Sequence, residues 1–255
     1  MTHRTRTRRN TYRVLAGAAA ALATIALAWH TTDSDDEPAH APDLHTRIDT
    51  LRVADEHYEG YDRDLFPHWD DLDGNGCDAR DDVLAAESQP PGVPCHDLEG
   101  GTWHSLFDDT TLTDPSEVSI DHMIPLAEAW RSGAHAWDTD RRRAFANDIT
   151  HPDTLIAVTP ASNTAKSDQD PADWMPPAPG TACRYTRAWV TVKETWNLTV
   201  DTDERDALHA QADTCDDDND NDAARHHRDT SMKDRLAKIE TAHGREVKPG
   251  VTVRR

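Results

Sequence analysis

The chain has 255 residues, of which 36% are hydrophobic and 29% charged, and its formal net charge is −21. This length allows one large domain or two small ones. With 48 acidic residues against 27 basic ones, the composition argues against binding of nucleic acid through a broad basic surface, because phosphate contacts need cations. An acidic, lysine-poor surface suits either a protein that works in concentrated salt, where charge repulsion is screened, or simply a soluble acidic exoprotein.

Residues 1–28 have the pattern of a secretory signal peptide. Five arginines, the last of them Arg13, precede a short apolar run at residues 14–27, and Ala26-Leu27-Ala28 fits a cleavage site. The apolar run is short for a membrane span, which needs about 20 residues, and an uncleaved N-terminal membrane anchor is the alternative. We therefore predict a secreted, extracellular protein, whose net charge changes from −21 to −26 when the five arginines are removed.

The four cysteines predict two disulfides, because their number is even and the chain is predicted to be exported. No C-x-x-C pair occurs, which argues against a zinc ribbon. Of the three ways to join them, we predict the pairing that is local in sequence, because each pair then flanks one compact unit. The predicted bonds are Cys77–Cys95 and Cys183–Cys215.

The first part of the chain predicts a linker, a helix and a hairpin. Residues 29–43 carry Asp, Pro and His without periodicity and predict a flexible linker. From Leu44 to Tyr58 the apolar positions recur at helical spacing, which predicts an amphipathic helix. Residues 101–107 alternate in the manner of a strand, and residues 110–112 are expected to pair back on them.

Between this helix and the hairpin lies an acidic, glycine-rich loop with two interpretations. It matches the first half of an EF-hand-like calcium loop, and an acid falls at the closing position, at Asp71, Asp73, Asn75, Gly76 and Asp82. However, Asp78 stands where such loops usually carry an aliphatic residue. The alternative is a turn that caps a helix at residues 81–87 and is fixed by a disulfide at Cys77.

The second half of the chain predicts two strands and several helices. Apolar runs at residues 118–122 and 155–159 predict strands that pair in one sheet. Helices are expected at residues 126–131 after Pro125, at residues 141–148 with Ala144, Phe145 and Ile149 buried, at residues 185–196, and after the capping box Asp201-x-x-Glu204. Residues 216–255 predict an acidic, mostly disordered tail with one helix at residues 231–243. The folded domain therefore spans residues 44–215.

The residues that can carry chemistry lie at the ends of these two predicted strands. Asp121 and His122 end the first strand, Asn163 follows the second, and Lys166 lies one helical turn later. Carboxylate and amide oxygens suit Mg²⁺, and a neutral imidazole accepts a proton near neutral pH. Adjacent residues of a strand point to opposite faces, so Asp121 and His122 can serve one site only where the strand twists or ends.

This pattern resembles the HNH, or ββα-metal, nucleases. The resemblance rests on Asp121-His122 before Ile124-Pro125, and on Asn163-x-x-Lys166-x-Asp168 after a short apolar strand. It is closest to secreted actinobacterial HNH endonucleases related to the C-terminal domain of the GmrSD restriction enzymes. It implies an α+β fold with a ββα-metal (HNH) core wrapped by additional helices. It also implies a hydrolase that cleaves DNA, or RNA, with Mg²⁺ or another divalent cation such as Mn²⁺.

The resemblance also assigns roles to single residues. His122 is the general base, Asp121 and Asn163 hold the metal, and Lys166 contacts phosphate, although a solvated surface lysine is the alternative. The middle Asn of the H-N-H signature should fall at or beside Thr154, where no Asn occurs, and Asp153 could brace the loop instead. We expect a monomer whose partner is nucleic acid, with no membrane partner apart from the alternative N-terminal anchor.

A different class of function stays open beside the nuclease. A secreted, disulfide-stabilised binding or inhibitor module, with or without calcium, needs no catalytic residues. A peptidoglycan or protein hydrolase would need H-E-x-x-H, a Ser/His/Asp set or a reactive cysteine, and none is evident. Several further histidines have no partner pattern and are interpreted as surface or structural residues: His96, His104, His135, His151 and the His226-His227 pair.

Overall fold

The structure is a computed structural model that describes residues 43–215. The predicted signal segment, nearly all of the predicted linker, and the predicted tail with its helix at residues 231–243 lie outside the described residues. The chain divides into Met1–His40 and Ala41–Arg255, and all described residues belong to the second unit. Within residues 43–215, no helix combines the length and the apolar character that a membrane crossing needs.

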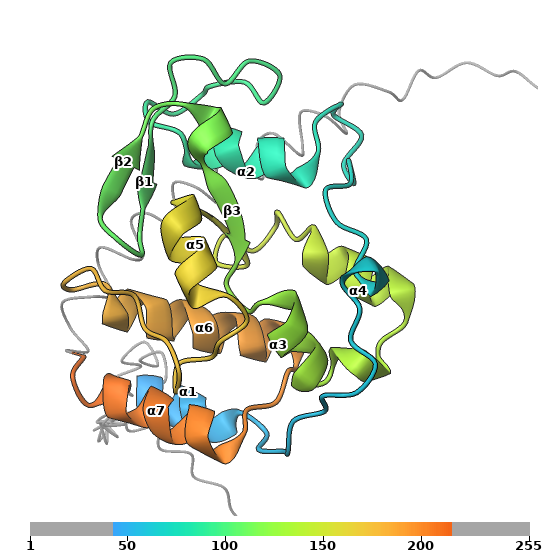
Figure 1. The fold of residues 1–255 in the computed structure, drawn as a ribbon, viewed down its shortest axis with the longest axis vertical. Coiled ribbons are helices and arrows are strands. Elements are labelled where there is room, and N and C mark those ends of the chain that lie inside the picture. Colours follow the sequence, from blue (N-terminus) through green and yellow to red (C-terminus); the bar gives the residue numbers. More distant parts are fainter. Residues whose placement is uncertain (1–42, 216–255) are drawn as a thin grey trace, which may run out of the picture. The chain divides into compact units, whose positions relative to one another are not determined.

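Helices and two small sheets together confirm the predicted α+β class (Figure 1). The α-helices of the described part are α1 (Leu44–Thr50), α2 (Ala79–Glu87), α3 (Leu126–Arg131), α4 (Thr139–Ala146), α5 (Pro160–Lys166), α6 (Ala182–Trp196) and α7 (Thr202–Ala212). Short 3₁₀ helices are η1 (Arg63–Leu65), η2 (Pro115–Glu117) and η3 (Ala134–Ala136). The strands are β1 (Trp103–Ser105), β2 (Thr110–Leu112), β3 (Ser119–His122) and β4 (Leu155–Val158).

Both predicted strand pairs form. β1 pairs antiparallel with β2, with Trp103 opposite Leu112. β3 pairs antiparallel with β4, with Asp121 opposite Ile156 and His122 opposite Leu155. Since directly paired residues of a sheet share a face, Asp121 lies on the face of Ile156, and His122 lies on the other face with Leu155.

The two faces of the β3–β4 sheet belong to different hydrophobic cores. On one face, Ile120, Leu155 and Ala157 pack with Val83 of α2 and with Trp103, whose indole nitrogen donates to the carbonyl of Leu84 at 2.7 Å. The other face joins the larger core through Ile156 and Val158, together with side chains of α1, α3, α4, α6 and α7. The sheet is therefore buried on both sides, and its polar residues need partners inside the protein.

Helices α1, α6 and α7 pack against one another and close the larger core (Figure 1). The predicted capping box begins α7, because the Asp201 carboxylate accepts the backbone N–H of Glu204 at 2.8 Å. Helix α6 confirms the helix predicted at residues 185–196, and its Tyr185, Trp189 and Val192 are almost fully buried.

The first helix is shorter in the structure than the sequence pattern predicted. α1 ends at Thr50, not near Tyr58, and Leu51 is already extended. The reason is a competing set of backbone bonds: Val200 N–H donates to the carbonyl of Arg52 at 2.9 Å, and Ala54 N–H donates to that of Val200 at 3.0 Å. Residues 52–54 thus extend alongside the start of α7 and carry the chain onward in an irregular path.

The helix predicted at residues 141–148 is also shifted. α4 begins at Thr139 because the Asp138 carboxylate caps it by accepting the N–H of Arg141. Its buried residues include Phe145, as predicted, but Ala144 is exposed and Arg142 is buried in its place. The Arg142 guanidinium is held inside because its Nε donates to the carbonyl of Leu65 at 2.9 Å.

Both predicted disulfides are present. One joins Cys77 to Cys95 across 18 residues, and the other joins Cys183 to Cys215 across 32 residues. The second bond joins Cys183, in the first turn of α6, to Cys215, three residues after the end of α7. It therefore closes the hairpin of α6 and α7 at its open end. The two bonds leave no free cysteine among the described residues.

Removal of the second disulfide should destabilise the fold. In the chain-entropy account, closing a loop of 32 residues contributes about 3–4 kcal/mol by restricting the unfolded chain. We expect the double variant Cys183→Ser, Cys215→Ser to unfold at a lower urea concentration by an amount that corresponds to this free energy. An unchanged urea midpoint would show that the bond has no stabilising role.

Candidate functional site

Asp121 and Lys166 form a buried ion pair between β3 and α5. The Lys166 ammonium donates to Asp121 Oδ2 at 2.7 Å and to the backbone carbonyl of His122 at 2.9 Å. Lys166 is fully buried and Asp121 is only 6% exposed. Burial raises the pKa of Asp121 and lowers that of Lys166, and the contact between the two opposes both shifts. Lys166 is therefore not a solvated surface lysine. Its ammonium is bound to the Asp121 carboxylate inside the protein.

Asn163 lies on the same side of the sheet as this pair. It donates through Nδ2 to the hydroxyl of Ser119 at 2.6 Å. Ser119 and Asp121 are two residues apart on β3 and share a face, while Asn163 and Lys166 are three residues apart on α5 and share a side of the helix. The two contacts thus run side by side between strand and helix, and they leave the amide oxygen of Asn163 available as a ligand.

The position of Asn163 in α5 differs from the one expected for a capping residue. Thr159 caps the helix instead, with its hydroxyl accepting the N–H of Ser162 at 3.1 Å, and Pro160 occupies the first turn, where its missing N–H costs nothing. Asn163 therefore lies one turn inside α5, and its side chain does not cap the helix.

His122 contacts a different element from Asp121. Its Nε2 lies 2.9 Å from the carbonyl oxygen of Ala146 at the end of α4. A carbonyl can only accept, so Nε2 carries the proton and Nδ1 carries the lone pair. The ring packs near Trp69 and Phe145, with centroid distances of 5.9 and 6.1 Å. Burial lowers the pKa of His122 to about 3, so its imidazole is neutral near pH 7.

The structure thus brings Asp121, Asn163 and Lys166 to one face and leaves the His122 ring on the other. β3 ends at His122, so the two adjacent residues occupy the last two positions of the strand. Both side chains are nearly fully buried, with 6% of Asp121 and 4% of His122 exposed.

The loop before β4 is braced by Thr154, at the position expected for the middle Asn of the H-N-H signature. Thr154 is fully buried, and its hydroxyl donates to Asp148 Oδ2 at 2.9 Å. Its carbonyl accepts the N–H of Met123 at 2.9 Å, which fixes the chain just after His122. The Asp148 carboxylate also binds His151 at 2.8 Å, so His151 has a structural role, as expected.

A cleft of about 450 Å³ lies beside Asn163. Its walls come from the segment before η1, the start of α3 and the end of α5. The lining residues are Tyr58, Tyr61, Arg63, Pro125, Leu126, Ala127, Arg131, Asn163, Ser167 and Asp168. Of the four predicted site residues, Asn163 alone lines the cleft; Asp121 and Lys166 are buried in the ion pair with which α5 packs on β3.

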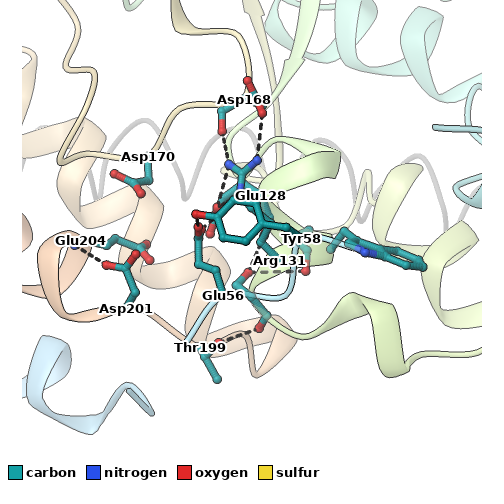
Figure 2. Close-up of polar contacts among 12 residues, drawn as sticks. Glu56, Tyr58, Glu128, Arg131, Asp168, Asp170, Thr199, Asp201 and Glu204 are labelled. Carbon is teal, nitrogen blue, oxygen red and sulfur yellow. Dashed lines mark hydrogen bonds and ion pairs between the residues drawn. The ribbon is translucent and has the colours of Figure 1, made fainter. Parts of the chain in front are cut away.

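Arg131 forms one wall of the cleft at the centre of an acidic network. It pairs with Glu56 at 3.1 Å, Glu128 at 3.0 Å and Asp168 at 2.8 Å. Figure 2 shows its guanidinium between Asp168 and the two glutamates. Arg131 thereby ties α3 to the segment after α5. Glu128 is fully buried and also binds Lys193 of α6 at 2.7 Å.

The acidic loop at residues 71–76 forms a hydrogen-bonded turn that leads into α2 (Ala79–Glu87). Asp71 accepts backbone N–H groups of Gly74 and Gly76, and the Asn75 amide donates to Asp82 at 2.8 Å. The Asn75 oxygen accepts the N–H of Cys77 at 2.7 Å. The side chains of Asp71 and Asn75 thus hold the turn together through hydrogen bonds within the loop.

These features agree with a nuclease family. Residues 94–211, which include β3, β4 and α5, match the family described as "GmrSD restriction endonucleases, C-terminal domain". The chain is also 43% identical over 159 residues to a protein of the fungus Arthroderma benhamiae named "Uncharacterized secreted protein". That alignment covers 62% of this chain and 76% of the fungal protein. The chain therefore belongs to one family with the fungal protein and is related to the GmrSD C-terminal domain. No solved structure matches it.

Sequence reasoning missed several residues of this region. Ser119 could have been found, because it stands two positions before Asp121 and strand alternation places both on one face. Glu128 and Arg131 could have been paired by their spacing of three on a predicted helix. Tyr61 and Arg63 carried no signal, because they lie in an irregular segment far from the site in sequence, and Tyr58 was interpreted only as an apolar position of a helix.

Proposed function

We propose that residues 44–215 form a secreted, divalent-metal-dependent endonuclease domain of the HNH type, which hydrolyses phosphodiester bonds of nucleic acid. The observation that carries this proposal is the parallel pair of contacts Asp121–Lys166 and Asn163–Ser119 between β3 and α5. It sets a carboxylate and an amide oxygen on one face, within the region that matches a restriction-endonuclease family. The secreted fungal relative and the two disulfides support export.

The donor set fits a hard divalent cation. Mg²⁺ prefers oxygen ligands, keeps several waters and is usually held by one or two protein carboxylates or similar oxygens. Asp121 uses only Oδ2 for Lys166, and Asn163 donates only through Nδ2, so each retains an oxygen that Mg²⁺ or Mn²⁺ can bind. Such a cation would stabilise the negative charge that develops on the phosphate and on the leaving oxygen.

The remaining residues then have defined tasks. His122 acts as the general base: the carbonyl of Ala146 holds its Nε2–H, so the lone pair on Nδ1 takes the proton from water. Lys166 acts as a positioning residue, because its ammonium fixes one Asp121 oxygen and the carbonyl of His122 at the same time. Thr154 and Asp148 fix the backbone beyond the strand end. The net charge of −21 makes added salt favourable for substrate encounter, because salt screens repulsion.

The test of the class is cleavage of plasmid DNA and of RNA by the full chain in Mg²⁺ and, separately, in EDTA, over a series of salt concentrations. Cleavage that needs the divalent cation is the expected result. An absence of cleavage in Mg²⁺ and in Mn²⁺ at every salt concentration would contradict the nuclease proposal.

Asn163→Ala should raise the Mg²⁺ concentration needed for half-maximal cleavage. Loss of an outer-shell partner at a metal site costs about 10–100-fold in metal affinity or activity, and loss of a direct ligand should cost at least as much. Asn163 is half-buried, so folding should survive. The matched control is Thr164→Ala, the next residue of α5, which is exposed and bonds only to its own helix. Superimposable Mg²⁺ curves for Asn163→Ala and the parent would contradict the assignment.

A further inference from the structure

Two tyrosines project from an irregular segment into the cleft beside Asn163. Tyr58 is 68% exposed and Tyr61 is 37% exposed, and both line the cleft. Among the described residues the other exposed large apolar side chains are Val53 and Leu72, and neither lines it. Exposed aromatic rings gathered in one cleft indicate a surface that binds another flat, apolar face.

Tyr58 is exposed yet held in place. Its hydroxyl donates to Glu56, and the Arg131 guanidinium lies 5.8 Å from the centre of its ring. Arg131 is in turn fixed by three acids. The hydrogen bond to Glu56 raises the pKa of Tyr58 to about 12. Figure 2 shows the ring at the front of this network.

Tyr61 is fixed by packing. Its ring lies 6.4 Å from that of Phe66 and 6.2 Å from that of Trp130, and both of those rings belong to the core. The two tyrosines therefore form a prearranged aromatic surface, for which little conformational entropy is lost when a ligand binds.

The charges around the cleft favour a single strand over duplex nucleic acid as the ligand. Arg63 and Arg131 line it together with Asp168, but Arg131 is already paired with acids on three sides. The rest of the chain is strongly acidic. Binding of duplex DNA through its backbone depends on cations that neutralise phosphates, and among the residues that line the cleft these are Arg63 and Arg131. Stacking of a base on an aromatic ring needs no net charge and contributes about 5- to 150-fold in affinity per base.

We infer that the cleft binds an unpaired nucleotide of the substrate, with its base on Tyr58 and Tyr61 and its phosphate near Arg63, so that single strands are bound in preference to duplex. The inference rests on the proposed nuclease function and adds the substrate class. The cleft of about 450 Å³ lies within the range of about 300–1,000 Å³ that small-ligand sites occupy. Asn163 in the same cleft places the bound nucleotide beside the proposed metal site.

Binding can be measured without cleavage, on the full chain in EDTA. The probes are a fluorescent oligothymidylate, an abasic oligonucleotide of the same length with the same phosphates, and a duplex of that length. We expect the parent to bind oligothymidylate at least 10-fold more tightly than the abasic probe and more tightly than the duplex. Tyr58→Ala with Tyr61→Ala should remove about 5- to 150-fold of that affinity per stacked base. Leu72→Ala, an exposed apolar residue outside the cleft, is the matched control and should bind as the parent does.

The outcomes separate this inference from the proposed function. Equal binding of oligothymidylate by the parent and by the double tyrosine variant would overturn it, as would equal affinity for the abasic probe or tighter binding of duplex. Tyrosine-dependent binding supports the site even if no cleavage is found, in which case the nuclease proposal alone fails. Cleavage that keeps its ratio of single-strand to duplex rates in the folded double variant would overturn the substrate class and leave the nuclease proposal intact.

Discussion

His122→Ala is expected to lower the turnover number for cleavage by roughly 10²–10⁴-fold, the usual contribution of a general base. The expectation rests on the ring's surroundings: Nε2 is committed to the carbonyl of Ala146, so Nδ1 is the proton acceptor, and burial keeps the ring neutral. Affinity for nucleic acid should survive, because the proposed task of His122 is to take a proton from the attacking water and not to hold the nucleotide. The measurement is single-turnover cleavage at saturating enzyme, with binding measured separately in EDTA.

Since His122 is buried, its loss could also disturb packing against Trp69 and Phe145. Thermal unfolding of the variant must therefore be compared with that of His122→Gln, which fills more of the space and retains an amide that can donate to Ala146. His104→Ala is the matched control, because His104 lies on β1, outside the proposed site, and its side chain is about half exposed. If His122→Ala and His122→Gln fold and still cleave at the parental rate, His122 is not the base.

The strands and both disulfides were predictable from the sequence because each depends on local information. The runs at residues 118–122 and 155–159 are apolar and β-branched, and they are bounded by proline or polar turns, so a pairing of the two was the simplest sheet. The cysteines flank single compact units. Helix bounds were less predictable: residues 52–54 carry a helical pattern, but backbone bonds to Arg52 and Ala54 from Val200, 148 and 146 positions away, override it.

The environment of the site residues was not predictable, because it depends on contacts between distant segments. The sequence gives no sign that Lys166 is fully enclosed or that its ammonium bonds to Asp121. Strand alternation did predict that Asp121 and His122 face opposite ways. Alternation does not predict which element each side chain contacts. Asp121 contacts α5, and His122 contacts the end of α4. The cleft likewise depends on Tyr58, which the helical pattern had placed at the end of a helix, and on Tyr61, to which no predicted element extended.

Lys193→Met should reduce the free energy of unfolding by about 3–5 kcal/mol, the usual cost of removing one partner from a buried ion pair. The Lys193 ammonium uses all three of its donors inside the protein, on Glu128 at 2.7 Å, on the carbonyl of Thr199 at 2.8 Å and on Glu204 at 3.1 Å. Lys193 and Glu128 are fully buried, and Glu204 is 1% exposed. Methionine fills the space but leaves buried Glu204 without its cation and Glu128 with Arg131 as its remaining cationic partner.

The pH dependence distinguishes this cause from simple loss of packing. Burial raises the pKa of Glu128 to about 8, and Lys193 is what opposes the shift; burial likewise raises the pKa of Glu204. An acid whose pKa is higher in the folded state keeps its proton there after the unfolded chain has lost it, so it lowers stability as pH rises from about 4.5 toward 8. Without Lys193 both pKa values rise further, and the deficit of the variant should be smallest near pH 5 and should grow toward pH 9.

Neutralising the acids should therefore rescue the variant. Glu128→Gln and Glu204→Gln together with Lys193→Met remove every charge of the buried set, and replacing a whole buried ion network by neutral groups is often neutral or stabilising. Arg47→Met is the control for a cation nearer the surface; its pair with Glu194 should contribute only about 0–1 kcal/mol. Urea unfolding at several pH values measures all four proteins. The loss of unfolding free energy in Lys193→Met could instead be the same at pH 5 and pH 9 and remain when both glutamines are added. That result would mean that lost packing, and not unpaired charge, destabilises the variant.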